Sequence, residues 1–162
     1  MTIVFVTGMS GAGKSTVLAE LERRGHRVVD TDEGDWTETV PDPDRGEDRI
    51  WREDLIDALL TGHAGGVLFL SGCVPNQGRF YPRFDAIVLL TAPPDVLLER
   101  VATRDTNDFG KSATERALVS DDIREVEPLL RTGATAEIDT RLPVADVADR
   151  LESIAGAVTP VE

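Results

Sequence analysis

The sequence predicts an α/β domain in three layers, in which a five-stranded parallel sheet lies between helices. Short apolar stretches rich in β-branched residues alternate along the chain with stretches whose apolar residues recur at helical spacing. The third apolar stretch runs without a polar residue, as in a parallel strand covered on both faces. We expect the strands at residues 2–7, 27–30, 66–70, 85–90 and 136–139. A chain of 162 residues is predicted to form a single domain over residues 1–162.

The composition of the chain argues against two classes of binding partner, nucleic acids and membranes. The formal net charge is -13, and the sequence has no cluster of Lys and Arg, so we expect no nucleic-acid partner. No apolar run approaches the roughly 20 residues that a membrane span needs, so we expect no membrane partner either. Cys73 is the only cysteine and the start of the chain does not read as a signal peptide, which favours a cytoplasmic protein.

The residues between the first strand and the first helix carry the most specific signal in the chain. Residues 8–15 read G-x-x-x-x-G-K-S, and Val17, Leu18 and Leu21 follow at helical spacing. This is the setting of a phosphate-binding P-loop, in which backbone N–H groups and a helix N-terminus surround phosphate oxygens. We therefore expect ATP and Mg²⁺ as cofactors. The expected nucleotide contacts in this loop are Gly8, Ser10, Gly11, Ala12, Gly13, Lys14, Ser15 and Thr16.

Charged and hydroxyl side chains near this loop are the candidates for the chemistry. Lys14 can bridge the β- and γ-phosphates as a catalytic group, and the Ser15 hydroxyl can be a Mg²⁺ ligand. The second strand ends in Asp30-Thr31-Asp32, at the edge where parallel sheets bind ligands. One of its acids can support the metal and the other can orient or deprotonate an attacking hydroxyl. A solvated acidic turn is the alternative.

The stretch from residue 31 to 62 is expected on the acceptor side of the site. Residues 37–48 are polar and acidic and are predicted to form a loop, and residues 47–61 a helix. In that helix Arg49 and Glu53 share a face, so Arg49 contacts a substrate or forms a surface ion pair. No acid follows the third strand, so we expect no Walker-B carboxylate and assign its supporting role to the acid turn. Cys73 is interpreted as a buried filler.

A helix over residues 93–104 places Arg100 and Arg104 one turn apart. We expect one guanidinium against the base and the other against phosphates, unless this is a solvated helix face. Residues 105–112 are polar and are predicted to form a lid, in which Lys111 is the cation that can reach a phosphate; an exposed loop is the alternative. Helices are predicted over residues 113–130 and 143–154.

The order of these parts resembles the nucleoside-monophosphate-kinase-like group of small P-loop kinases, and within it most closely shikimate kinase. Loop 8–15 also looks like that of gluconate kinase. The resemblance implies a three-layer α/β/α P-loop NTPase fold with strand order 2-3-1-4-5 and a small lid. Residues 128–131, 134–135 and 138–140 resemble the last helix and strand of shikimate kinase.

The resemblance also implies roles for single residues. Asp30-Thr31-Asp32 matches the D-T-D of shikimate kinases, which implies that Asp30 serves the metal and that Asp32 contacts the substrate hydroxyl. Arg49 falls where that family has an arginine for a substrate carboxylate. Arg100 and Arg104 match the E-R-x-x-x-R of adenylate kinases, which implies adenine and phosphate contacts, with Arg104 in a catalytic role.

Departures from shikimate kinase concern the acceptor. Its Gly-Gly-Gly after the third strand is Ser71-Gly72-Cys73 here, its second carboxylate-binding arginine aligns with Val126, and the predicted lid has no arginine. The acceptor is therefore expected to differ from shikimate. We assign Ser71, Gly72 and Arg79 to the acceptor-binding side, beside Asp32 and Arg49.

The function that these features favour is Mg²⁺-dependent transfer of the γ-phosphoryl group of ATP to a hydroxyl of a small metabolite. A nucleoside or nucleotide kinase is one alternative, since Arg49 and Arg79 can serve an α-phosphate. A nucleotide-binding regulatory ATPase is the other. The expected partners are a nucleotide and a small-molecule acceptor, and the expected state is a monomer or weak homodimer.

Overall fold

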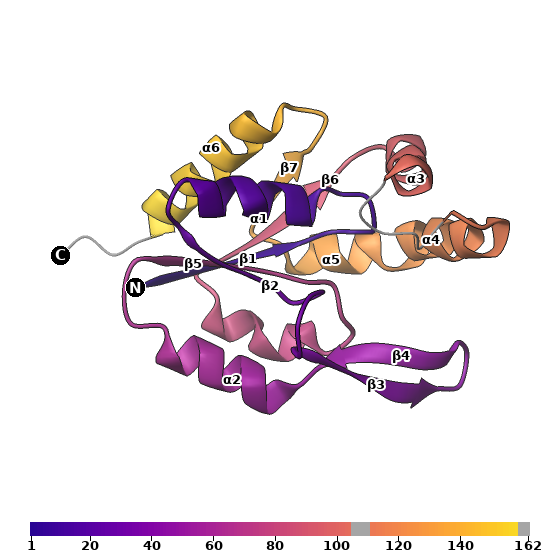
Figure 1. The fold of residues 1–162 in the computed structure, drawn as a ribbon, viewed down its shortest axis with the longest axis horizontal. Coiled ribbons are helices and arrows are strands. Elements are labelled where there is room, and N and C mark those ends of the chain that lie inside the picture. Colours follow the sequence, from indigo (N-terminus) through magenta and orange to yellow (C-terminus); the bar gives the residue numbers. More distant parts are fainter. Residues whose placement is uncertain (105–110, 159–162) are drawn as a thin grey trace.

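The computed structural model describes residues 1–104 and 111–158, and its centre is a five-stranded parallel sheet (Figure 1). The strands of the chain are β1 (Thr2–Thr7), β2 (Arg27–Asp30), β3 (Thr37–Asp42), β4 (Gly46–Trp51), β5 (Val67–Ser71), β6 (Ala86–Thr91) and β7 (Ala136–Asp139). The central sheet has the order β2-β5-β1-β6-β7, and β3 and β4 form a separate two-stranded sheet. Once this hairpin is set aside, the order is the predicted 2-3-1-4-5.

Helices cover both faces of the central sheet. They are α1 (Lys14–Arg23), α2 (Glu53–Gly62), the 3₁₀ helix η1 (Gln77–Arg83), α3 (Pro94–Thr103), α4 (Ala113–Glu125), α5 (Glu127–Gly133) and α6 (Val144–Val158). In Figure 1, α1 and α6 lie on one face and α2 on the other. The core is divided accordingly: one cluster joins the sheet to α1, α3, α4, α5 and α6, and the second joins it to α2, β4 and η1. The predicted three-layer fold is confirmed.

The prediction of a loop at residues 37–48 is wrong, because these residues form the antiparallel hairpin of β3 and β4. A tight turn closes the hairpin: the Asp42 carboxylate accepts from the N–H groups of Asp44 and Arg45, and Gly46 adopts a left-handed φ of 82°. Since β4 continues to Trp51, α2 begins at Glu53 and not at residue 47. Arg49 therefore lies on a strand and shares no helix face with Glu53.

The helix predicted over residues 113–130 is two helices. The backbone turns at Val126, between α4 and α5, and Pro128 lacks the N–H that a continuous helix would need there. Leu129, in the first turn of α5, is 70% exposed. The predicted lid at 105–112 lies mostly outside the described residues, which resume at Lys111.

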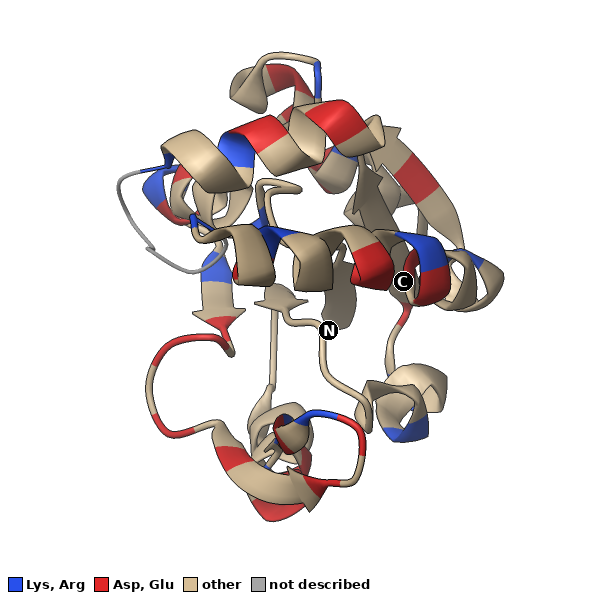
Figure 2. Cartoon of the chain, turned by 90° about the vertical axis from the view of Figure 1, so that its right-hand side faces the viewer, with Lys and Arg blue, Asp and Glu red and all other residues tan. Residues whose placement is uncertain are grey.

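The surface is rich in acidic side chains. Figure 2 shows Asp and Glu scattered over one side of the molecule, with Lys and Arg between them. Among the helices of the described ranges 1–104 and 111–158, none has the length and apolar character to cross a membrane.

Candidate active site

The carboxyl ends of β1, β2 and β5 bring the P-loop, the acid turn at residues 30–32 and Ser71 to one edge of the sheet, the edge at which α/β folds bind ligands. The P-loop connects β1 to α1, and Gly13 caps the helix with a left-handed φ of 93°. Gly11 lies against α3, where a Cβ atom would stand 2.7 Å from the Leu97 carbonyl oxygen. Only glycine allows this approach, so α3 supports the P-loop from behind.

Lys14 lies over the P-loop and not away from it. Its Nζ donates to the carbonyl oxygens of Gly8, at 2.6 Å, and Met9, at 3.3 Å. Ser10, Gly11 and Gly13 are partly accessible around it, whereas Ala12 is buried. The ammonium is thus held at the N-terminal end of α1, where backbone N–H groups and the helix dipole favour an anion.

Ser15 and the acid turn after β2 come together at the start of α1. The Ser15 hydroxyl donates to the Asp30 carboxylate at 2.6 Å, and the second oxygen of Asp30 accepts from the N–H of Asp32 at 3.0 Å. Thr16 is exposed beside Ser15, and Asp32 is exposed at the sheet edge. A hydroxyl and a carboxylate in contact are the oxygen donors that Mg²⁺ prefers, so Ser15 and Asp30 fit this ion.

A buried network fixes the acid turn from below. Thr31 is 0% exposed, and its hydroxyl donates to the Ser71 carbonyl oxygen at 2.7 Å while accepting from Trp51 Nε1 at 2.9 Å. Gly72 lies against both partners, because a Cβ atom there would be 2.5 Å from Thr31 Oγ1 and 3.2 Å from the indole. The acids on either side of Thr31 are therefore positioned by the end of β5 and by the hairpin.

The two arginines of the predicted row have different surroundings. Arg100 donates to the Gly11 carbonyl oxygen at 3.2 Å and to the hydroxyl and carbonyl oxygens of Thr140 at 2.8 and 2.9 Å. It thus ties the P-loop to the turn after β7. Burial lowers the pKa of the Arg104 guanidinium, and the charge of Asp32 acts in the opposite direction. Arg104 and Asp32 are therefore within electrostatic reach of each other.

Two predicted acceptor residues are not joined to the acid turn by any contact seen in the described part of the chain. Arg49 is exposed on β4 and donates to the Thr37 hydroxyl at 2.7 Å, across the hairpin. Arg79, whose side chain is 73% exposed on η1, pairs with Glu53 at 3.2 Å. Ser71 and Gly72 lie close to the turn, but both are buried.

Sequence reasoning missed two residues that hold the hairpin of β3 and β4 in place, Asn76 and Arg45. Asn76 accepts from the Trp51 N–H at 2.9 Å and donates to the Trp51 carbonyl oxygen at 3.0 Å, so it holds the end of the hairpin. Arg45, at the hairpin tip, forms an ion pair with Asp122 on α4. The D-P-D-R-G turn is a signal for the hairpin, but no local pattern indicates a partner 77 residues away.

The sequence predicted a filler at Cys73 and a phosphate contact at Lys111. Burial raises the pKa of the Cys73 thiol, while the charge of Lys14 and a hydrogen bond to Thr7 act against that rise. A protonated thiol is a poor nucleophile, which agrees with the interpretation of Cys73 as a filler. Lys111 is exposed just before α4, and the rest of the predicted lid, residues 105–110, lies outside the described part.

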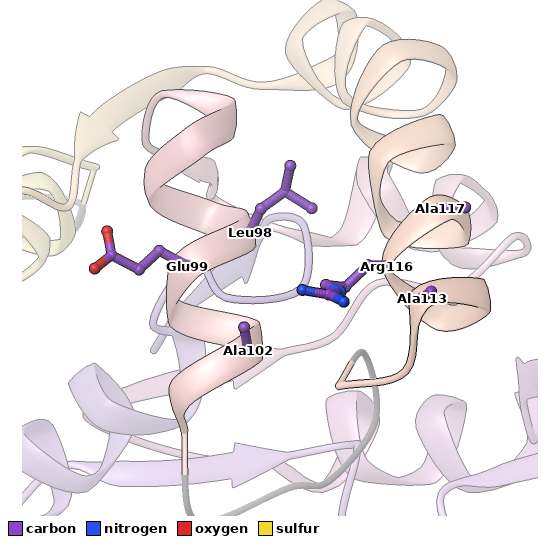
Figure 3. A pocket seen from close by; sticks show the side chains of 6 residues that line it. All are labelled: Leu98, Glu99, Ala102, Ala113, Arg116 and Ala117. Atoms are coloured by element: carbon purple, nitrogen blue, oxygen red, sulfur yellow. The ribbon is translucent and has the colours of Figure 1, made fainter.

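A groove of about 560 Å³ lies between α3 and α4 (Figure 3). Its lining is mostly apolar and comprises Leu98, Glu99, Ala102, Ala113, Arg116 and Ala117. In Figure 3 Arg116 reaches from α4 toward α3, whereas Glu99 points away. None of the predicted site residues lines this groove, so we do not assign the chemistry to it.

Most of the chain matches a known family. Residues 4–126 match the family model AAA_18, described as an AAA domain. The chain belongs to this AAA domain family. A nucleotide-binding protein of Gluconobacter oxydans (strain 621H) is 30% identical to this chain over 171 residues. The match covers 96% of this chain, but the chain spans only 47% of that relative.

Solved kinase structures share the fold of this AAA domain. A shikimate kinase from Acinetobacter baumannii in complex with shikimate has a TM-score of 0.64 at 21% identity, over 97% of this chain and 94% of that chain. A shikimate kinase from Bacteroides thetaiotaomicron has a TM-score of 0.64 at 19% identity, over 94% and 97%. A sugar kinase from Janibacter sp. HTCC2649 has a TM-score of 0.57 at 18% identity, over 99% of both chains. The predicted likeness to small P-loop kinases is confirmed for the fold.

Proposed function

We propose that this AAA domain transfers the γ-phosphoryl group of ATP, with Mg²⁺, to a hydroxyl of a small metabolite. The observation that carries the proposal is the meeting of two parts at one sheet edge: the P-loop with Lys14, and the Ser15–Asp30 pair, with the exposed Asp32 two residues further along the acid turn. Phosphoryl transfer requires mainly positioning and neutralisation of charge, and these parts supply both.

The metal would be held by Ser15 and Asp30, whose oxygens are in contact. When bound, Mg²⁺ supplies positive charge to the phosphate oxygens. The chain's own cations act beside it: Lys14 neutralises charge that develops on the transferred group, and Arg104 adds a second cation near Asp32. Arg100 supports the nucleotide through the P-loop, and Lys111 stays a proposed phosphate contact.

Asp32 is proposed to orient the acceptor hydroxyl and to accept its proton. It is exposed at the sheet edge, while Asp30 is engaged by Ser15 and by the Asp32 N–H. The two acids therefore have separate tasks, one toward the metal and one toward the acceptor. Arg49 and Arg79 form the outer rim of the acceptor side, with the buried Gly72 beneath the acid turn.

A hydroxyl acceptor is favoured over a nucleotide acceptor by the charge of the acid turn. The candidate arginines decide little, because Arg79 forms only an exposed ion pair with Glu53 and Arg49 donates to the Thr37 hydroxyl. The acid turn would repel the α-phosphate of a nucleotide, whereas Asp32 suits a neutral hydroxyl.

A screen of ADP release in the presence of sugars, polyols, hydroxy acids, nucleosides and nucleotides tests the proposal. One of the first three classes should raise ADP release well above the rate without acceptor, and a phosphorylated product should appear in equal amount. In Lys14→Ala this turnover should fall by roughly 10²–10³-fold, because a cation is lost from the transition state. Turnover within threefold of wild type in Lys14→Ala would refute the role of Lys14.

A regulatory ATPase is the second candidate, and one observation favours it. The Gluconobacter oxydans relative is described as a nucleotide-binding protein, not as a kinase, and this chain spans less than half of it. In that case ATP hydrolysis should proceed at the same rate with every acceptor in the screen, and no phosphorylated acceptor should form. A stimulated rate with product excludes this candidate.

A further inference from the structure

The hairpin of β3 and β4 is attached to the rest of the chain at its base and at its tip. At the base, Trp51 is 0% exposed and donates to the buried Thr31 hydroxyl in the acid turn. At the tip, Arg45 forms an ion pair with Asp122 of α4. Most residues between these two points are exposed or only partly buried. A segment with few buried contacts opens locally at little cost, so the contact at the tip can determine where the hairpin lies.

The contact at the tip is strong enough to hold the hairpin and weak enough to open. Both terminal nitrogens of Arg45 donate to the Asp122 carboxylate, one to each oxygen, as in a bidentate pair. The Arg45 side chain is 41% exposed and that of Asp122 25%, so water and salt reach the pair. An ion pair with this exposure shifts an equilibrium by about fivefold or less.

The helix that receives the hairpin tip is packed on the nucleotide side of the molecule. Its buried residues Val119 and Ile123 belong to the core cluster that also contains Met9 and Ala12 of the P-loop. The base of the hairpin, by contrast, is bonded to the acid turn. In Figure 1 both α4 and the hairpin extend beyond the end of β1. The ion pair at the tip therefore joins the nucleotide side to the acid turn beyond the carboxyl ends of the strands.

The electrostatics around Cys73 place this ion pair near the acid turn. Cys73 comes two residues after the end of β5, at the edge where Asp32 is exposed. Burial is the main cause that raises the pKa of the Cys73 thiol, and the charges of Asp32 and Asp122 add to the rise. Both carboxylates are thus within electrostatic reach of one thiol. The hairpin therefore begins at the acid turn and is held at its tip near the same edge of the sheet.

We propose that the hairpin (residues 37–51) is a strap across the acid turn, which the Arg45–Asp122 pair holds closed and which opens to let the acceptor reach Asp32. The pair positions the hairpin and does not contact the reacting atoms. The passage of the acceptor rests on the proposed transfer function, whereas the closing of the hairpin rests on its contacts at the base and at the tip. A closed hairpin also keeps water away from the transferred group.

Cys73 is the probe of opening, because it is the only cysteine of the chain and is partly buried near Asp32. Its rate of reaction with N-ethylmaleimide, a neutral thiol reagent, is measured at low and at high NaCl concentration without nucleotide. Wild type is compared with Arg45→Gln, which breaks the pair, and with Arg124→Gln as a matched control. Arg124 is 70% exposed and pairs with Asp121 inside α4, so the control removes the same charge without releasing the hairpin.

In Arg45→Gln, Cys73 should react about twofold to fivefold faster than in wild type at low salt, because the hairpin is open more often. The unpaired charge of Asp122 in this variant opposes ionisation of the thiol, so electrostatics alone predicts a slower reaction. High salt should speed the reaction in wild type, by screening the pair, but not in Arg45→Gln. Arg124→Gln should behave as wild type at both salt concentrations.

The kinetic readout uses an acceptor found in the screen of ADP release. Arg45→Gln should raise the ratio of ATP hydrolysis to phosphoryl transfer by a similar factor, since an open hairpin admits water. The KM for ATP should stay within about twofold of wild type, because Trp51 still holds the acid turn at the base of the hairpin. A merely structural defect would lower the melting temperature of Arg45→Gln well below that of Arg124→Gln, and we expect the two to agree within about 2 °C.

Equal rates of Cys73 reaction in wild type and Arg45→Gln would overturn the inference, as would an equal acceleration in Arg124→Gln. A faster reaction that is accompanied by a much lower melting temperature would also overturn it, because Cys73 would then react through unfolding. If Arg45→Gln reacts faster as expected while no acceptor raises ADP release, the closing of the hairpin is supported and only the transfer function fails. If an acceptor is found and the rates are equal, only the inference on the hairpin fails.

Discussion

Thr31 illustrates how one buried side chain can position two exposed ones. Its hydroxyl lies between the Ser71 carbonyl oxygen and the Trp51 indole, so the backbone of the acid turn cannot rotate without breaking two buried hydrogen bonds. Asp30 and Asp32 are consequently presented in different directions, one toward Ser15 and one toward solvent near Arg104. Their difference in environment is the physical basis for assigning them different roles.

The variants Asp32→Asn and Asp30→Asn should separate these roles. Asp32→Asn should lower transfer by roughly 10²–10⁴-fold with little change in ATP affinity, because it removes the group that orients and deprotonates the acceptor. Asp30→Asn should weaken binding of the Mg²⁺–nucleotide, because it removes the carboxylate beside Ser15. Steady-state kinetics and calorimetry measure the two effects, and an equal loss of nucleotide affinity in both variants would refute the division.

At the scale of elements, the hairpin β3–β4 was the element that sequence reasoning missed. Most residues of its two strands are exposed or only partly buried, and few of them are large and apolar. Their acidic composition therefore resembled that of a loop. The P-loop was predictable for the opposite reason: its glycines, lysine and serine lie at fixed local spacing between a strand and a helix. Residues at fixed local spacing predict local conformation. The contact of Trp51 with Thr31 joins residues 20 positions apart, so no local pattern predicts it.

The hairpin should act on the site through Trp51, which is 0% exposed and stacks edge-on against Phe5 with ring centroids 5.4 Å apart. Trp51→Phe keeps an aromatic ring but removes the Nε1–H that Thr31 accepts. We expect a loss of roughly 2–4 kcal/mol in unfolding free energy, from the hydrogen bond and the smaller ring, measured by urea denaturation.

The same variant should lower kcat and also weaken binding of the Mg²⁺–nucleotide, because Thr31 positions both Asp32 and Asp30, the carboxylate beside Ser15. A control is Trp36→Phe, which alters the other, partly buried tryptophan outside this network. An unchanged kcat together with an unchanged KM for ATP in Trp51→Phe would mean that the hydrogen bond from Trp51 to Thr31 does not position the acid turn.

At the scale of the whole molecule, the alternation of strands and helices predicted the layered parallel fold, and the resemblance to small P-loop kinases implied the sheet order that the structure has. The sequence predicted the ends of the helices and strands less well. Val126 is the clearest case: apolar residues recur on both sides of it at helical spacing, yet α4 ends before it and α5 begins after it. The sequence also gave no indication of ion pairs between residues far apart in the chain. One such cluster joins the end of α1 to α6, where Arg24 contacts Asp149 and Glu152.

This cluster predicts how stability changes with pH. A hydrogen bond from His26 at 2.7 Å is the main cause that lowers the pKa of Glu152 below its usual value of 4.5, and Arg24 adds to it. A carboxyl whose pKa is lower in the folded protein stabilises it above the unfolded-state pKa, and this contribution is lost as the pH falls through the folded-state pKa. Since Glu152 is 35% exposed, the contribution is about 1 kcal/mol or less.

Glu152→Gln should therefore be less stable than wild type at pH 7, and the difference should vanish as the pH is lowered below about 4.5. Comparing the two proteins at each pH removes the general effect of the net charge of -13, which falls toward zero for both near the isoelectric point of about 4.5. Urea denaturation between pH 7 and pH 3 measures the difference. A gap between the two proteins that stays constant down to pH 3 would show that the ionised carboxylate of Glu152 does not stabilise the contact of α1 with α6.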